Sequence, residues 1–213
     1  VDQAGLKMRR LWQVLLLFAL ALPWLAWAAA AGQWDDFRAL RGHTVLAGND
    51  GPALRFPTTL AVDRRGRVWI GENTGLSRLD GDLVRRYAAA DVAAMAAGFI
   101  RVFHPLDNGD VLIGGDREGL LHWRLQHDDF VPVQVMGGGD LSRVNAVEPA
   151  ADGGAWVAAE QGLFHWDAQR GSLSRVELGI GQQRHSPRIF DVQQMDDGTL
   201  WIAAAPGLYR RGP

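Results

Sequence analysis

The chain has 213 residues, of which 47% are hydrophobic, and a formal net charge of -2 at pH 7. This charge excludes the strongly basic surface with which many proteins bind nucleic acid, so no nucleic-acid partner is expected. The absence of cysteine excludes a disulfide framework, a cysteine-ligated zinc site and a thiol nucleophile.

The N-terminal segment has the three parts of a secretory signal peptide. A basic cluster, KMRR, precedes an almost wholly apolar run over Leu11–Trp27, and small residues follow. We predict a natural start at Met8, cleavage after Ala28 at the end of a leader over 1–28, and a linker over 29–40. The mature chain is then exported to the periplasm. An uncleaved membrane anchor is the alternative, because about 17 apolar residues are only just enough to span a bilayer.

After the leader, one segment recurs four times along the chain. The copies are DRRGRVWIGENTGLSRLD, DNGDVLIGGDREGLLHWR, ADGGAWVAAEQGLFHWD and DDGTLWIAAAPGLYRR. Their central apolar residues, Trp69, Leu112, Trp156 and Trp201, are separated by 43, 44 and 45 residues. A single copy would be weak evidence, whereas four copies at one period indicate a repeat architecture.

Each repeat predicts four short antiparallel strands. The first strand alternates apolar and polar residues, as in 143–150 and 188–195, which is typical of a strand with one buried face. A turn rich in Asp, Asn and Gly leads to a nearly continuous apolar strand such as RVWIG, which is typical of a strand covered on both faces. A glycine opens the third strand, and a weaker fourth strand follows, as in LVRRYA. Residues 88–98 have a helical composition but lie between repeats, so we expect a connecting loop with one helical turn there.

Four such strands in a period of about 44 residues predict an all-β protein, a β-propeller with one blade for each repeat. Over 41–213 we therefore expect four blades of an incomplete propeller. Trp69, Trp156 and Trp201 are expected to fill the space between neighbouring blades, where a buried Trp is worth about 3–5 kcal/mol relative to Ala. The repeat glycines are expected to allow positive φ where the strands turn sharply. Those in the turns before the second strands are Gly66, Gly109, Gly153 and Gly198, and those that open the third strands are Gly75, Gly119, Gly162 and Gly207.

The repeats resemble the two-component regulator propeller repeat, with its pattern D-x-x-G-x-[VL]-W-I-G-x-x-x-G-L-x-R-[LY]-D. The first and fourth copies fit best, whereas the second has Leu112 in place of Trp and the third has Val157 and Ala158 in place of Ile-Gly. The resemblance covers about 41–213. It implies the periplasmic sensor region of a membrane-spanning histidine kinase or diguanylate cyclase. It also implies a seven-bladed propeller, so we interpret the chain as the N-terminal piece of a longer protein, with a closed four-bladed propeller as the alternative.

The sequence contains no recognisable enzyme motif. His122 and His165 occupy one repeat position, which is Arg78 and Arg210 in the other copies. An arginine cannot replace a metal ligand, so we interpret this position as a polar site on the third strand and expect no metal or cofactor. The run MGGGD lacks the Lys-Ser/Thr of a phosphate loop, and no Gly-x-Ser-x-Gly elbow is present. The chain is therefore interpreted as a non-enzymatic sensory module, with a lyase-like periplasmic propeller enzyme and a passive interaction scaffold as alternatives.

A ligand is expected at the mouth of the central channel, where one residue from every blade converges. The first strands begin near three arginines, and polar residues occupy the loops between the second and third strands. The candidates are Arg101, Arg143, Arg188, Glu72, Asn73, Asp116, Arg117, Glu160 and Gln161. Arginines spaced one per blade would suit an anionic ligand such as an acidic sugar. The alternative is that they are solvated strand ends paired with nearby acids.

The expected partner is thus a periplasmic small molecule, anionic or carbohydrate, or a protein. Contact with the membrane is expected only through the signal peptide or through segments downstream of this chain. The full-length protein is a candidate homodimer.

Overall fold

The computed structural model describes residues 56–213 except for 82, 89–91, 93, 96–98, 118, 180–186 and 206. Pro52–Pro213 form one compact unit. The predicted leader, its cleavage site at Ala28 and the linker lie outside the described residues. Within the described part of the chain, no helix is long and apolar enough to cross a membrane.

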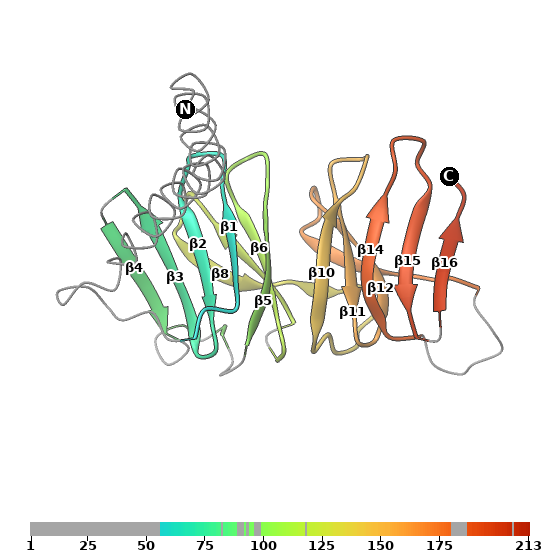
Figure 1. The fold of residues 1–213 in the computed structure, drawn as a ribbon, viewed down its shortest axis with the longest axis horizontal. Helices are drawn as coiled ribbons and strands as arrows, with labels where there is room; N and C mark the ends of the chain where they lie inside the picture. The colour runs from blue at the N-terminus through green and yellow to red at the C-terminus, as the bar shows by residue number, and fades with distance from the viewer. Residues whose placement is uncertain are drawn as a thin grey trace, which may run out of the picture. The chain divides into compact units, whose positions relative to one another are not determined.

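The described residues form four sheets, one for each sequence repeat (Figure 1). Blade 1 has the strand order β1 (Thr59–Val62), β2 (Val68–Glu72), β3 (Gly75–Asp80) and β4 (Leu83–Ala88). Blade 2 has the order β5 (Ile100–Pro105), β6 (Val111–Gly115), β7 (Leu120–Arg124) and β8 (Asp129–Pro132). Blade 3 consists of β10 (Val144–Pro149), β11 (Ala155–Ala159), β12 (Gly162–Asp167) and β13 (Ser172–Val176), with the short β9 (Gln134–Val135) added parallel to β13. Blade 4 has the order β14 (Ile189–Gln194), β15 (Leu200–Ala204) and β16 (Gly207–Arg211).

The predicted all-β propeller blades are confirmed. Consecutive strands within each blade are antiparallel, and the first strands of successive blades, β1, β5, β10 and β14, lie next to one another (Figure 1). Blade 4 has three strands among the described residues, which correspond to the first three strands of the repeat. In the connection after blade 1, Met95 N donates a hydrogen bond to Val92 O at 2.8 Å, which forms a single turn, and the buried Met95 packs between blades 1 and 2.

Residues on the second strand of a blade alternate between its two neighbours. On β6, Val111 and Ile113 pack in the apolar cluster shared with blade 1, and Leu112 packs in the cluster shared with blade 3. A third cluster, which includes Trp156 and Ile202, fills the interface between blades 3 and 4. This explains why the second strands of blades 2 and 3 read as continuous apolar runs, since both faces of these two sheets are covered.

The three repeat tryptophans do not have the same surroundings. Trp69 is fully buried, and its ring centroid lies 4.7 Å from that of Trp123 and 6.1 Å from that of Phe103, both in blade 2. Trp156 is half-buried in the interface between blades 3 and 4. Trp201 differs from the expectation, because it is 40% exposed where no described blade covers blade 4.

The third-strand glycines follow the prediction in three blades. Gly75, Gly119 and Gly162 have φ values of 139°, 64° and 134°. At Gly119 a side chain is also excluded sterically, because a Cβ atom would lie 2.5 Å from the carbonyl oxygen of Leu141. Gly207 departs from the prediction, since it lacks a positive φ and has open space around it.

A β-bulge recurs near the start of the first strand in blades 2, 3 and 4. The register places Arg101, Asn145 and Phe190 at the extra position, which Thr58 occupies before β1. Asn145 Nδ2 donates to Ile189 O of blade 4 at 2.7 Å, and Thr58 Oγ1 donates to Ile100 O of blade 2 at 2.5 Å. These side chains therefore link the first strand of one blade to that of the next.

Candidate functional site

The predicted binding arginines lie at the end of the blades where the first strands begin, but they do not share one repeat position. Arg143 and Arg188 come directly before Val144 and Ile189, the first residues of β10 and β14. Arg101 instead follows Ile100, at the bulge of β5. Relative to the equivalent residues Ile100, Val144 and Ile189, Arg101 therefore lies two positions further along its strand than Arg143 and Arg188 do.

Each of these arginines is paired with a carboxylate of a loop between second and third strands. Arg143 Nε lies 3.1 Å from Asp116 Oδ1, which also binds Arg101, and Arg188 contacts Glu160. The hydrogen bond from Arg101 lowers the pKa of Asp116, and the charge of Arg143 adds to this against the opposing effect of burial. The arginine charges are therefore compensated within the protein, as expected for paired strand ends, and binding of an anion here stays a prediction.

The other predicted site residues have different surroundings from one another. Glu72 is buried within blade 1, where it accepts hydrogen bonds from Ser77 Oγ at 2.7 Å and Arg86 Nη2 at 3.4 Å. Gln161 donates to Ser142 Oγ at 2.5 Å. The last two candidates are Asn73, beside a shallow hollow near Phe56 and Phe99, and the exposed Arg117.

At the other end of the blades, a carboxylate that the sequence analysis missed connects blades 1 and 2. Asp128, in the turn between β7 and β8, accepts hydrogen bonds from Trp123 Nε1 at 3.0 Å, Tyr87 Oη at 2.9 Å and Arg78 Nη1 at 3.1 Å, and it also binds Arg85. Three of these four partners belong to blade 1. We call these five residues the Asp128 cluster.

The ionisation of the Asp128 cluster follows from its contacts. Burial raises the pKa of Asp128, but hydrogen bonds from Tyr87 and Trp123 and the charges of Arg78 and Arg85 outweigh it, so the net pKa is lowered. Burial, together with the hydrogen bond to Asp128, raises the pKa of Tyr87 to about 12. At neutral pH the cluster therefore holds an ionised carboxylate and a neutral phenol.

A second buried ion pair lies in the same interface. Asp63 Oδ2 accepts hydrogen bonds from Arg67 Nε at 2.7 Å and from Trp69 Nε1 at 2.9 Å. The Arg67 guanidinium lies 5.0 Å from the ring centroid of Trp123 in blade 2. Burial raises the pKa of Asp63, but the hydrogen bonds from Trp69 and Arg67 outweigh it and lower the net pKa. The interface between blades 1 and 2 thus pairs the carboxylates of Asp63 and Asp128 and the indole N–H groups of Trp69 and Trp123, whereas Arg78 Nε has no hydrogen-bond partner among the described residues.

The interface between blades 2 and 3 lacks the equivalent carboxylate. The strand registers place Trp166 at the position of Trp123 and Gly171 at that of Asp128. The two turns match in detail, since the amides of Asp128 and Gly171 donate 2.8 Å hydrogen bonds to Arg124 O and Asp167 O, with φ values of 50° and 61°. Trp166 is only 2% exposed, and its Nε1 has no hydrogen-bond partner among the described residues.

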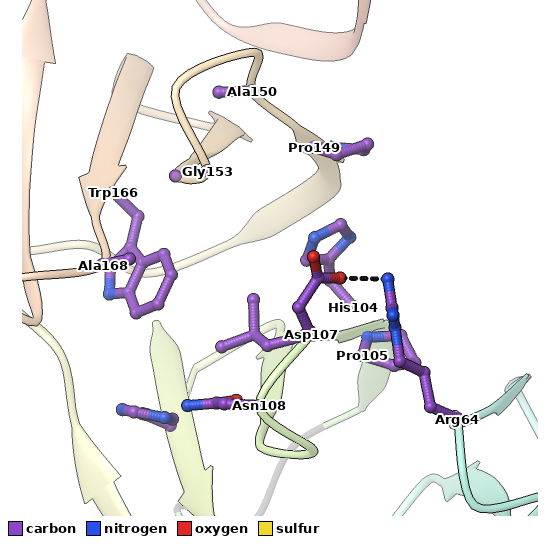
Figure 2. Close-up of a pocket in the computed structure, with 13 residues that line it drawn as sticks. Arg64, His104, Pro105, Asp107, Asn108, Pro149, Ala150, Gly153, Trp166 and Ala168 are labelled. Atoms are coloured by element: carbon purple, nitrogen blue, oxygen red, sulfur yellow. Dashed lines mark hydrogen bonds and ion pairs between the residues drawn. The ribbon is translucent and has the colours of Figure 1, made fainter.

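A cleft of about 500 Å³ opens in this interface (Figure 2). Trp166 lies on one side, with His104 and Asp107 opposite, and Asp107 pairs with Arg64 (Figure 2). The remaining lining residues come from the ends of the first strands, the turns and the third strands of blades 2 and 3, and they are Pro105, Leu106, Asn108, His122, Pro149, Ala150, Gly153, Gly154 and Ala168. Burial lowers the pKa of His104, against a smaller opposing effect of Asp107, so its imidazole is neutral at pH 7.

The repeat histidines each face one carboxylate. His122 Nε2 lies 2.8 Å from Asp110 Oδ2, and His165 Nε2 lies 3.1 Å from Asp152 Oδ2. Both lie opposite the central residue of the second strand, Leu112 and Trp156 respectively. Within the described ranges, no three His, Asp or Glu side chains gather into a group that could hold a metal ion.

Comparison with known proteins gives matches in structure. No protein-family model matches the chain, and no curated protein matches it in sequence. The extracellular domain of BT3049, assigned to a hybrid two-component system of B. thetaiotaomicron, has a TM-score of 0.64 at 17% identity, over 75% of this chain and 24% of that one. The extracellular domain of BT4673, assigned to a one-component system of the same organism, has a TM-score of 0.62 at 18% identity, over 78% and 22%.

A virginiamycin B lyase from Staphylococcus aureus, in a catalytically inactive form with quinupristin, also matches. Its TM-score is 0.53 at 13% identity, over 78% of this chain and 57% of the lyase. This chain spans only about a quarter of the length of the two extracellular domains. At these identities the likeness shows the propeller fold.

Proposed function

We propose that these blades belong to the ligand-input region of an exported bacterial sensor of the two-component regulator propeller family. The observation that carries this proposal is the likeness of the blades to extracellular domains assigned to one-component and two-component systems. The repeat pattern and the secretory leader read from the sequence support the same function. The output domain, a histidine kinase or a diguanylate cyclase, would lie outside this chain.

The exposed face of blade 4 supports a place within a larger propeller. Leu208 pairs with Ala203 in the register that Leu76, Leu120 and Leu163 have in blades 1 to 3. Those three leucines are buried against the following blade, whereas Leu208 is 68% exposed. Trp201 lies on the same strand pair and is also exposed. This face has the composition of a blade interface, and we propose that a further blade covers it.

Export is tested with alkaline phosphatase fused after Pro213 in a Gram-negative host, because the enzyme is active only after export. We expect phosphatase activity from the intact fusion and none after deletion of 8–28. A fusion that keeps its activity without these residues would contradict export by this leader. Mass spectrometry of the periplasmic protein should place the mature N-terminus at Ala29 or close to it.

The sensory role is tested on the full-length protein in membranes, by measuring autophosphorylation or cyclic dinucleotide synthesis. Disrupting the buried Trp69 with Trp69→Ala should change the output level, whereas the control His127→Ala, in an exposed turn, should not. An output that both substitutions leave unchanged would contradict an input role. The lyase alternative predicts that the purified chain consumes quinupristin, which chromatography detects, and consumption would favour an enzyme.

A further inference from the structure

The three blade interfaces differ in their polar links at the end of the blades where first strands lead into second strands, which we call the turn end. There, blades 1 and 2 are joined by the ion pair of Arg64 and Asp107, one residue from each turn. Blades 3 and 4 are joined by Gln194, whose Oε1 accepts hydrogen bonds from Ala151 N at 2.8 Å and Trp156 Nε1 at 3.1 Å. Among the described residues, no hydrogen bond or ion pair joins the equivalent turns of blades 2 and 3, where the cleft lies instead (Figure 2).

Two positions of the repeat explain why these links are missing. Pro149 pairs with the first residue of its second strand, as Gln194 does in blade 4, but it offers neither a side-chain acceptor nor an N–H. Gly171 takes the turn position of Asp128, which binds Trp123 and three residues of blade 1. Blade 3 thus lacks both side chains with which blades 2 and 4 hold the blade before them.

The polar contacts between blades 2 and 3 lie away from the cleft. Arg143 Nε is 3.1 Å from Asp116 Oδ1, and Gly119 N donates to Ser142 O at 3.1 Å, both at the end where the first strands begin. At the outer edge of blade 3, β9 pairs with β13. The two blades also share an apolar cluster, which opposes their complete separation. Opening at the turn end alone therefore breaks no described hydrogen bond between these blades.

Trp166 lowers the cost of opening at the turn end. Its Nε1 is buried and has no hydrogen-bond partner among the described residues, so the closed interface leaves one donor unsatisfied. The Trp166 ring lines the cleft and its centroid is 5.7 Å from that of His122 in blade 2, so we expect separation of the blades to bring water to this N–H. The same movement between blades 1 and 2 would instead break the hydrogen bonds of Asp128 with Tyr87 and Arg78.

We propose that the blade array bends at the interface between blades 2 and 3, by opening of the cleft about the contacts at the opposite end. Blades 1 and 2 move as one body and blades 3 and 4 as another, because each of these pairs is linked at both ends. This inference rests on the proposed function, because it names the movement by which the input region responds to its ligand. A ligand or neighbouring domain that binds one width of the cleft better than another shifts the angle between the two bodies.

The first test compares two tryptophans that are buried at equivalent positions. Trp123 is 1% exposed and Trp166 is 2% exposed, so exchange of either indole N–H with solvent requires an opening of its interface. The rates are measured by NMR on the full chain with ¹⁵N-labelled tryptophan, and Trp123→Phe and Trp166→Phe assign the two signals. We expect Trp166 to exchange at least about tenfold faster, in line with one hydrogen bond fewer to break. Equal rates would overturn the proposal.

The second test measures the movement itself. The chain contains no cysteine, so pairs of spin labels can be attached at chosen positions by cysteine substitution. Asp80, His127 and Gln169 are exposed at the junctions of third and fourth strands in blades 1, 2 and 3. In double electron–electron resonance, the pair at His127 and Gln169 should give a broader distance distribution than the pair at Asp80 and His127. Distributions of equal width would overturn the bend, even if Trp166 exchanges quickly.

A substitution at Gly171 should reduce the bending. Gly171 has a φ of 61°, which Asn tolerates, and a Cβ atom there would meet nothing within 4 Å. Gly171→Asn supplies an amide oxygen where blade 2 has the carboxylate of Asp128, so we expect about tenfold slower exchange at Trp166 and a narrower distance distribution. Gly171→Ala has no acceptor and is the matched control, which should show neither change. Equal behaviour of the two variants would count against the proposal.

The readouts separate this inference from the proposed function. Bending is read on the chain itself, whereas signalling is read from the output of the full-length protein. If Gly171→Asn suppresses bending and leaves the output unchanged, the bend is supported and the sensory role is contradicted. If the output responds to a stimulus while the two label pairs give distributions of equal width, the sensory role is supported and the bend is overturned.

Discussion

Replacing Asp128 with glycine tests whether paired polar groups hold blades 1 and 2 together. Glycine occupies the equivalent turn position in blade 3 and suits the φ of 50° at Asp128, so the substitution adds no backbone strain. It removes the acceptor for Trp123 Nε1 and Tyr87 Oη and the ionic partner of Arg78. The effect should therefore come from the lost side-chain contacts.

The size of the effect follows from the burial of the two neutral donors. Trp123 is 1% exposed and Tyr87 is 6% exposed, whereas the side chain of Asp128 is 30% exposed, so water can enter part of the space that it leaves. At about 1–3 kcal/mol for each unsatisfied buried donor, the two together set an upper limit of about 2–6 kcal/mol on the loss in the free energy of unfolding. Arg78 retains its contact with the ring of Trp123, at 5.1 Å from the centroid, which limits its own contribution.

The assay is urea unfolding of the purified chain, followed by tryptophan fluorescence and circular dichroism. The neighbouring residue supplies a matched control, because Asp129 pairs only with Arg124 at the surface among the described contacts. Asp129→Ala should destabilise the chain far less than Asp128→Gly, because it removes only an ion pair at the surface. If Asp128→Gly destabilises the chain no more than Asp129→Ala does, the reasoning from buried donors is refuted.

Further predictions concern packing, titration and the arginines. Trp69→Ala should destabilise the chain by about 3–5 kcal/mol and the exposed Trp201→Ala by less than about 1 kcal/mol, and equal losses in urea unfolding would contradict the blade assignment. Tyr87 should titrate near pH 12 in ultraviolet absorbance, with its stabilising contribution complete below its ordinary pKa of 10.0 and lost as the pH rises through about 12. A folded-state midpoint near 10 would contradict this. If the arginines bind anions, calorimetry with uronic acids should show affinity that falls with salt and is lost in Arg143→Ala and Arg188→Ala; unchanged binding in both would remove them from the site.

The number, order and strand composition of the blades could be predicted from the sequence, because turn glycines and second-strand residues such as Trp69 recur at one period. The residues that make one interface unlike the next could not be found in this way. Asp128 and Gly171 occupy equivalent turn positions. A comparison of repeats detects residues that equivalent positions have in common, and it passes over positions at which the repeats differ. A carboxylate present in one copy alone resembles ordinary surface variation until its four partners are seen.

The candidate site was harder to predict for a geometric reason. Arg101 and Arg143 could be grouped because both lie near the start of a first strand, although Arg101 comes 11 residues before Leu112 and Arg143 comes 13 residues before Trp156. The acidic partners of the arginines were present among the candidates, but their pairing across blades depends on the three-dimensional arrangement. The unpaired indole N–H of Trp166 could not be predicted from the sequence either, because it depends on which residues surround the ring in the folded chain.

The Asp128 cluster also affects which blades can pair while the chain folds. The repeats have similar backbones, so a blade could in principle dock against the wrong neighbour, a known failure of repeat proteins. Placed beside a blade without the equivalents of Arg78 and Arg85, the carboxylate of Asp128 would be partly buried without its cationic partners, which costs free energy. Blade 2 therefore discriminates among blades of nearly identical shape, and its acidic turn helps to fix the order in which the repeats assemble.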